Sequence, residues 1–122
     1  MVIYKVPEEI MKKVTITPPI PVTNLRGQKV VDQNTQEQIV IKPADVFFTL
    51  TESPEFHRDL KGVLAIELSV RAGKWIREIP PEGGEVEIDD DLLEAFQRAL
   101  EVFVPGTQFA HCLLPIVECI KP

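Results

Sequence analysis

The side chains best suited to bind a metal or attack a substrate are few in this 122-residue chain. They are the two histidines and the two cysteines, His57, His111, Cys112 and Cys119. Zinc ligands usually come in closely spaced pairs such as C-x2-C, and the sequence contains no such pair. Both cysteines fall in the most apolar stretch, where a free cysteine behaves as a small hydrophobic residue. We therefore expect them to pack in a core, and we expect no metal or other cofactor.

Nucleophilic catalysis by a cysteine requires an accessible thiolate beside a base. His111 directly precedes Cys112, so on a helix their side chains would point about 100° apart. His57 would have to approach Cys112 through the fold. The sequence also lacks the G-x-S-x-G, P-loop, G-x-G-x-x-G and H-E-x-x-H motifs. These observations predict a protein that is not an enzyme, with a small enzyme using Cys112 or a carboxylate pair as an alternative.

Three consecutive aspartates, Asp89, Asp90 and Asp91, followed by Glu94 invite a calcium-binding interpretation. An EF-hand loop beginning at Asp89 requires glycine at its sixth position, and that position holds Glu94. The calcium pattern therefore fails. Carboxylates at a helix start can accept free N–H groups and oppose the helix dipole. We expect Asp89 or Asp90 to cap a helix here.

The charge of the chain is unevenly distributed. Lysine and arginine number 13 and aspartate and glutamate 19, which gives a net charge of −6. Residues 82–101 contain eight acidic residues and one arginine, so this segment carries −7 and the rest of the chain +1. Nucleic-acid phosphates are bound by clustered Lys and Arg, so we expect no direct nucleic-acid binding. The acidic segment is either a solvated helix start or a surface that steers a basic partner.

The length and the 44% hydrophobic content predict one domain with a core of its own. Charged residues interrupt the first 14 positions before the apolar core of a secretory signal could form. No uncharged apolar run approaches the ~18 residues of a membrane helix. We therefore expect a cytoplasmic protein without membrane contact and with reduced thiols.

Two further segments are candidate interaction surfaces. The Pro-rich stretch 18–21 makes residues 1–24 a possible extended arm, which would either connect elements rigidly or lie across a neighbouring subunit. Cations gather around Trp75 at the end of a predicted helix, where the dipole favours them and where Trp and Arg could form a binding hot spot. Their sign is opposite to that of segment 82–101, which permits head-to-tail self-association. The candidate interaction residues are Pro18, Pro19, Pro21, Arg71, Lys74, Trp75, Arg77, Asp89, Asp90 and Asp91.

Hydrophobic periodicity and turn residues predict an α+β fold, in which a small antiparallel sheet built on an N-terminal hairpin packs against three or four helices. The predicted strands are 14–17, 29–31, 38–41 and 85–88. The predicted helices are 43–52, one that restarts at the Ser53 cap and runs to residue 73 or 75, one from 89 or 90 to 103, and 109–120. Pro115 either breaks this last helix or separates a helix from a closing strand at 115–120.

The order of elements from Leu25 onward resembles small, mostly uncharacterised accessory proteins encoded by tailed phages and prophages. The resemblance rests on Gly27 to Asp32, Val46 to Leu50, Lys61 to Leu68, Val86-Glu87-Ile88 and Leu92 to Leu100. It implies a viral accessory or assembly protein without an active site.

Taken with the absent catalytic motifs and the segregated charge, the resemblance predicts a non-enzymatic protein–protein interaction protein. It would be a phage virion or tail-assembly component or an assembly helper, in the host cytoplasm or the virion, and could be a homo-oligomer. The alternative is an acidic inhibitor that occupies the basic groove of a host enzyme acting on nucleic acid.

Overall fold

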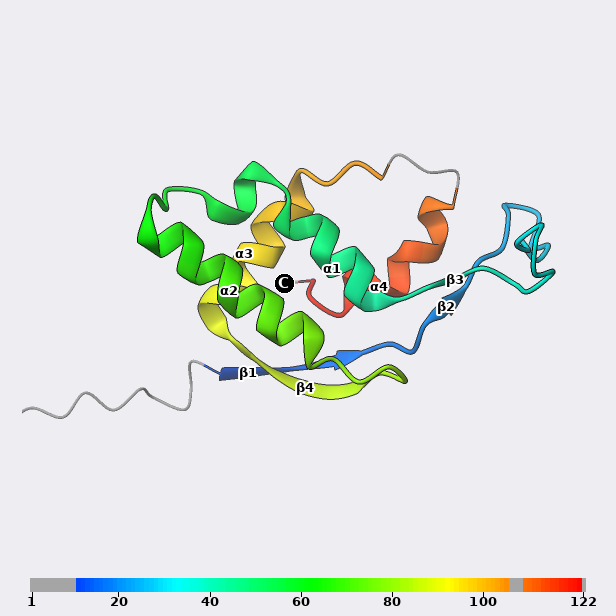
Figure 1. The fold of residues 1–122 in the computed structure, drawn as a ribbon, viewed down its shortest axis with the longest axis horizontal. Helices are drawn as coiled ribbons and strands as arrows, with labels where there is room; N and C mark the ends of the chain where they lie inside the picture. Colours follow the sequence, from blue (N-terminus) through cyan, green and yellow to red (C-terminus); the bar gives the residue numbers. More distant parts are fainter. Residues whose placement is uncertain (1–10, 106–108, 122) are drawn as a thin grey trace, which may run out of the picture.

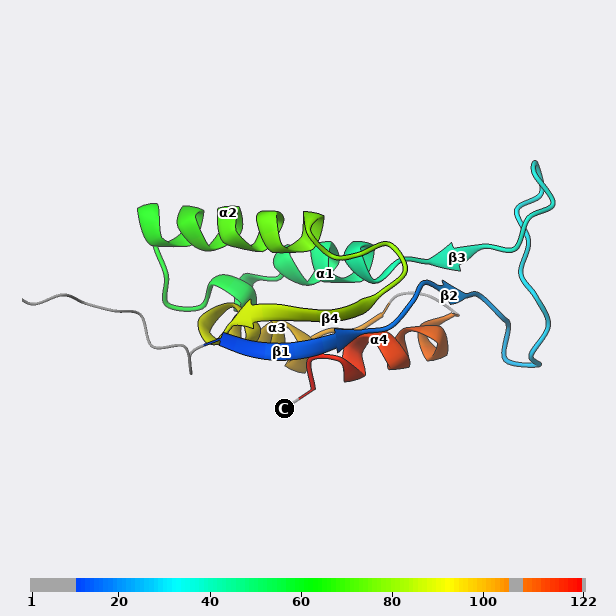
Figure 2. The same ribbon diagram turned by 90° about the horizontal axis from the view of Figure 1, so that it is seen from below.

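A computed structural model describes residues 11–105 and 109–121. It confirms the predicted α+β class, because helices pack against one side of a small antiparallel sheet (Figures 1 and 2). In chain order the elements are β1 (Met11–Ile16), β2 (Ile20–Pro21), β3 (Val40–Ile41), α1 (Pro43–Thr51), the 3-10 turn η2 (Pro54–His57), α2 (Val63–Arg77), β4 (Gly84–Asp89), α3 (Asp90–Glu101), the 3-10 turn η3 (Ala110–Leu113) and α4 (Leu114–Glu118).

The main sheet consists of β1 and β4, which pair antiparallel from Met11 opposite Asp89 to Ile16 opposite Gly84. Side chains alternate between the two faces of a strand, so Val14 and Ile16 are buried while the residues between and beside them face solvent. Both strands agree with the sequence prediction. Their pairing was not predicted, because β4 comes from far along the chain rather than from the N-terminal third.

The N-terminal hairpin forms a second, smaller sheet in which β2 pairs with β3. The strand predicted at 29–31 is wrong in its extent, since only isolated bridges form, between Thr23 and Lys29 and between Val31 and Gln38. The loop between Val31 and Gln38 is closed by the Asp32 carboxylate, which accepts hydrogen bonds from the N–H groups of Asn34 and Thr35. Figure 2 shows that this hairpin projects beyond the helical body.

The long helix predicted from Ser53 to Trp75 is wrong as one element. Ser53 does cap, because its hydroxyl accepts a hydrogen bond from the N–H of Glu55, but only the short turn η2 follows. Asp59 and Gly62 then adopt positive φ angles of 64° and 59°, which a right-handed helix does not allow. The chain reverses there, and α2 begins afresh at Val63 and continues past Gly73 to Arg77.

Aromatic rings fill the core between the helices. The rings of Phe47, Trp75 and Phe56 each contact the ring of Phe96, and Phe47 also contacts Trp75, with centroids 5.1–5.3 Å apart in each of these pairs. Such edge and tilted contacts add to the hydrophobic stabilisation of burial. The cluster joins α1, η2, α2 and α3 into one packed body.

The C-terminal segment is helical, so of the two predicted alternatives the helix with a break near Pro115 is confirmed and the closing strand at 115–120 is wrong. It consists of η3 and then α4, with Pro115 in the first turn of α4. Proline is tolerated there because the first-turn N–H groups have no partner within the helix. The side-chain amide of Gln97 donates to the carbonyl of Ile120 at 2.9 Å, which ties this segment to α3.

Candidate interaction surface

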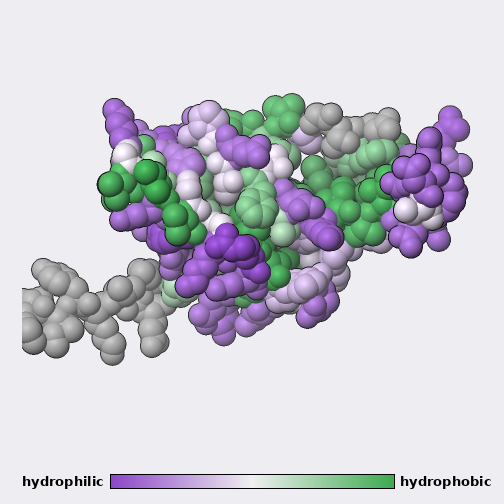
Figure 3. All heavy atoms as spheres, in the orientation of Figure 1, coloured by the Kyte–Doolittle hydropathy of each residue, from purple (hydrophilic) through white to green (hydrophobic). Residues whose placement is uncertain are grey.

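α2 presents an apolar face to solvent as well as to the core. Its buried residues are Leu68, Ala72, Trp75 and Ile76. On the opposite side Val63, Ile66 and Val70 are 68%, 64% and 64% exposed. Because a helix turns about 100° per residue, their spacing places these three side chains in one row. We call this row the apolar ridge, and Figure 3 shows an apolar patch over the N-terminal half of α2.

The apolar ridge was not found from the sequence. One continuous helix from Ser53 would have placed Val63 and Leu64 on the core face, and this expectation is wrong because α2 starts anew after Gly62. Leu64 is 59% exposed. A usable signal existed, since the first turns of α2 carry apolar residues on all sides, whereas a surface helix is normally polar on its outer face.

A groove of about 800 Å³ lies beside the apolar ridge. Its walls come from the chain before α2, from α2 itself and from α3, and are formed by Arg58, Asp59, Leu60, Leu64, Glu67, Leu68, Arg71, Asp91, Glu94 and Arg98. Leu64 and Leu68 form part of an apolar wall, and charged side chains surround it. The groove thus combines apolar surface with both signs of charge.

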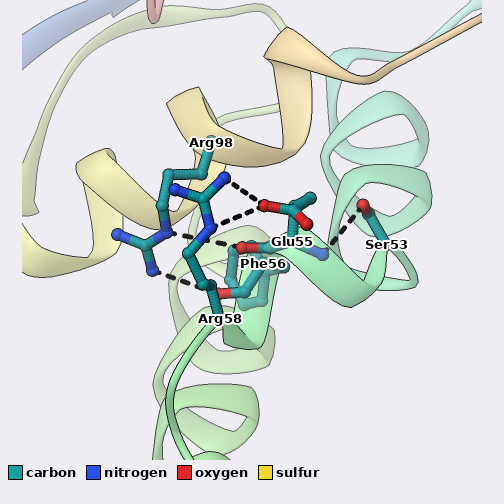
Figure 4. Close-up of polar contacts among 5 residues, drawn as sticks. All are labelled: Ser53, Glu55, Phe56, Arg58 and Arg98. Atoms are coloured by element: carbon teal, nitrogen blue, oxygen red, sulfur yellow. Dashed lines mark hydrogen bonds and ion pairs between the residues drawn. The ribbon is translucent and has the colours of Figure 1, made fainter.

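The three arginines of the groove are already engaged. Arg98 donates to the carbonyls of Glu55 and Phe56 at 3.4 and 3.3 Å, and Arg58 forms an ion pair with the Glu55 carboxylate (Figure 4). Arg71 pairs with Asp89 at 3.2 Å. These contacts hold η2 to α3 and α2 to β4, and they leave little of the positive charge available to a ligand.

The carboxylates of the groove, in contrast, are free. Among the described residues, the side chains of Asp59, Glu67, Asp91 and Glu94 have no hydrogen-bond or ion-pair partner. All four residues are exposed: Asp59 lies in the loop before α2, Glu67 in α2, and Asp91 and Glu94 in the first half of α3. The unpaired charge in this groove is therefore negative, which favours a cationic side chain as a neighbour.

Some of the predicted interaction residues near this surface are exposed, and others are engaged in ion pairs or in the core. The predicted N-cap position of α3 is confirmed at Asp89, but the expected capping hydrogen bond of its side chain is not formed. The Asp89 carboxylate pairs with Arg71 instead. Asp90 and Asp91 lie in the first turn of α3, as expected from the helix dipole. Trp75 is 8% exposed and belongs to the core.

The remaining predicted cations, Lys74 and Arg77, are exposed in the last turn of α2. Pro18 and Pro19 lie between β1 and β2, whereas Pro21 lies in β2 opposite Val40 of β3. Of the predicted arm, residues 1–10 fall outside the described part of the chain. Met11–Ile16 pair with β4, and Val22 is buried, so this part of the segment packs against its own body.

The cysteines and histidines have separate partners. Cys112 is buried and its thiol donates to the carbonyl of Thr23 at 3.6 Å, whereas Cys119 is half-buried. The Nε2 atom of His57 lies 2.7 Å from the hydroxyl oxygen of Ser69, a contact between η2 and α2 that the sequence did not reveal. Within the described ranges, no group of three His, Cys, Asp or Glu residues could hold a metal ion.

The chain was compared with models of known protein families, with curated proteins and with solved structures, and none of them matches. In residues 11–105 and 109–121, no helix has the length and apolar character needed to cross a membrane.

Proposed function

We propose that this chain is a non-enzymatic protein-interaction protein whose partner packs on the apolar ridge of α2. The observation that carries the proposal is the row of Val63, Ile66 and Val70, each about two-thirds exposed on the side of α2 opposite the core. Burying apolar surface at an interface stabilises a complex by about 25 cal/mol per Å². Exposed apolar residues that gather in one place, rather than scatter singly, mark a surface that another molecule covers.

The groove adds chemical specificity to this surface. Glu67 lies on the flank of the ridge, and Asp91 and Glu94 line the same groove from α3. A matching partner presents an apolar strip with Lys or Arg beside it, because an apolar centre with a polar rim is the usual anatomy of a protein interface. Opposite charges at the rim speed association and set the orientation of the partner.

In its finer form, the proposal is that the chain acts as a virion or tail-assembly component of a phage, or as an assembly helper. The support is the resemblance of residues 25–100 to small phage accessory proteins and the Pro-rich segment that precedes the hairpin. Assembly proteins work through surfaces that repeat from copy to copy, and an exposed helix row supplies such a surface.

A second candidate function is that of an acidic inhibitor of a basic nucleic-acid-handling enzyme. The start of α3 favours it, because the carboxylates of Asp90, Asp91 and Glu94 have no partner among the described residues. Charge reversal distinguishes the two candidates. The variant Asp90→Lys/Asp91→Lys should abolish inhibitor binding and should leave binding through the apolar ridge largely intact.

Site-specific photo-cross-linking tests the proposed function. Benzoylphenylalanine replaces Val70 on the ridge or, as a control, Glu101 at the exposed end of α3, in the full chain expressed in its native host. We expect protein adducts, including adducts between copies of this chain, from position 70 and none from position 101. The absence of adducts from position 70, and from Ile66 in a second variant, would overturn the proposal.

A further inference from the structure

We infer that the apolar ridge of α2 pairs with the ridge of a second copy of this chain, with the two helices antiparallel. The inference rests on the proposed function and names its partner. Val63, Ile66 and Val70 follow the spacing of coiled-coil positions a, d and a. The same pattern continues with Gly73 at the next d position and Arg77 at the next a position. α2 therefore carries a coiled-coil seam about two turns long on its solvent side.

The charges beside the seam fix the orientation of the pair. Glu67 and Lys74 both follow a d residue and occupy the e positions, which set the orientation of paired helices. When two copies run antiparallel with Ile66 against Val70 of the second copy, Glu67 flanks Lys74 of the second copy. The two-fold symmetry makes this contact twice. Both side chains are exposed and have no ion-pair partner among the described residues.

A parallel pair lacks this complementarity. It would place Arg77 of one copy directly against Arg77 of the other in the a layer, which like charge disfavours. Glu67 would then face the g position of the second copy, which holds the uncharged Ser69. Antiparallel helices also align their dipoles favourably, since the positive end of one lies beside the negative end of the other.

Gly73 fits the same arrangement. A glycine within a helix destabilises it by roughly 0.5–1 kcal/mol relative to alanine, so its presence calls for a compensating contact. In the antiparallel register, Gly73 lies opposite Val63 of the second copy. A Cβ at Gly73 would come within 4 Å only of the flexible Arg77 side chain, at 3.2 Å, so the space above this residue is open. The missing side chain allows the backbones to approach at that layer.

The short seam limits the affinity. A standard interface buries about 800 Å² per partner, and a row of three side chains supplies less than that even with its flanks. We therefore expect a reversible dimer with a dissociation constant in the micromolar range, about 10–100 µM. At this affinity, dimer and monomer exchange and both are present at the concentrations of an ultracentrifuge experiment.

Sedimentation equilibrium of the full chain over a range of concentrations tests the pairing. We expect Ile66→Glu to weaken dimerisation more than a hundredfold, because it places a carboxylate in the apolar seam. Glu67→Lys and Lys74→Glu should each weaken it about tenfold, because each replaces two attractive contacts by repulsive ones. The double variant Glu67→Lys/Lys74→Glu should restore the wild-type dissociation constant. Glu101→Lys is the matched control, with a changed charge on an exposed helix position away from the seam.

The charge-swap variants test the orientation of the two helices. Only a dimer that brings residues 67 and 74 together recovers its dissociation constant in the double variant. All four substituted side chains are exposed, so circular dichroism is expected to show unchanged folding. A wild-type protein that remains monomeric throughout, or a dimer that ignores Ile66→Glu, would overturn the inferred self-pairing. Ridge adducts to a different protein in the photo-cross-linking experiment would then still support the proposed function, whereas their absence would overturn both.

Discussion

The indole N–H of Trp75 donates a 2.9 Å hydrogen bond to the main-chain carbonyl of Glu87, and this contact joins α2 to β4. The Trp75 ring also packs against Phe47 and Phe96. The core-facing side of α2 is thus fixed by the packing of Trp75 and by its hydrogen bond to Glu87. The opposite side of the helix, which carries the apolar ridge, therefore faces solvent.

Removal of this hydrogen bond should destabilise the fold. Trp75→Phe keeps an aromatic ring but leaves the Glu87 carbonyl without its indole donor and opens a small cavity. We expect a loss of about 2–3 kcal/mol in the free energy of unfolding. Urea unfolding followed by circular dichroism measures it, because the chain contains only one tryptophan and the variant has none. An unchanged unfolding midpoint would show that the contact contributes nothing.

Gly83 should not tolerate a side chain. It has a φ of +81°, and an added Cβ would lie 2.5 Å from the carbonyl oxygen of Ile16 and 2.8 Å from the nitrogen of Pro18. Gly27 has the same φ of +81° but no atom within 4 Å of an added Cβ. Gly27→Ala should therefore cost about 1 kcal/mol from backbone strain alone. Gly83→Ala should cost clearly more, since the β1 backbone must move as well.

The two glycine variants are compared by urea unfolding with Trp75 fluorescence as the probe. Equal destabilisation by Gly83→Ala and Gly27→Ala would contradict the close packing of the turn before β4 against the end of β1.

Arg98 should matter more to stability than Arg58, although both contact η2. Arg98 is half-buried and donates to two main-chain carbonyls, so Arg98→Gln leaves these acceptors poorly satisfied, and we expect a loss of about 1–2 kcal/mol. Arg58 pairs with Glu55 near the surface, and such pairs contribute about 0–1 kcal/mol. Arg58→Gln is therefore the matched control. Thermal unfolding of both variants ranks them, and the reverse order would refute this assignment.

The two thiols should differ in reactivity. Cys112 is 6% exposed and its thiol faces the carbonyl of Thr23, while Cys119 is only half-buried. Because access limits alkylation of a folded protein, iodoacetamide should modify Cys119 first and Cys112 only as the protein opens. Mass spectrometry of peptides over time measures both rates. Faster labelling of Cys112 would mean that the η3 segment does not pack as described.

Local sequence signals determined most of the elements. Pro43 starts α1 and Ser53 caps η2, because proline and serine act on the backbone groups nearest to them. The alternation in 85–88 and the apolar spacing from Leu92 to Phe96 and beyond specify β4 and α3 in the same way. These effects operate over one or two turns of chain, so they can be recognised without the fold.

The tertiary structure alone decided how these elements meet. The partner of β1 is β4 rather than the hairpin, because the shared core selects between strands that have similar local character. The break at Asp59 and Gly62 divides a stretch whose apolar spacing is also that of one helix. That break turned Val63 out of the core and created the apolar ridge with Ile66 and Val70, since the exposure of a side chain depends on what packs against the helix and not on its periodicity alone.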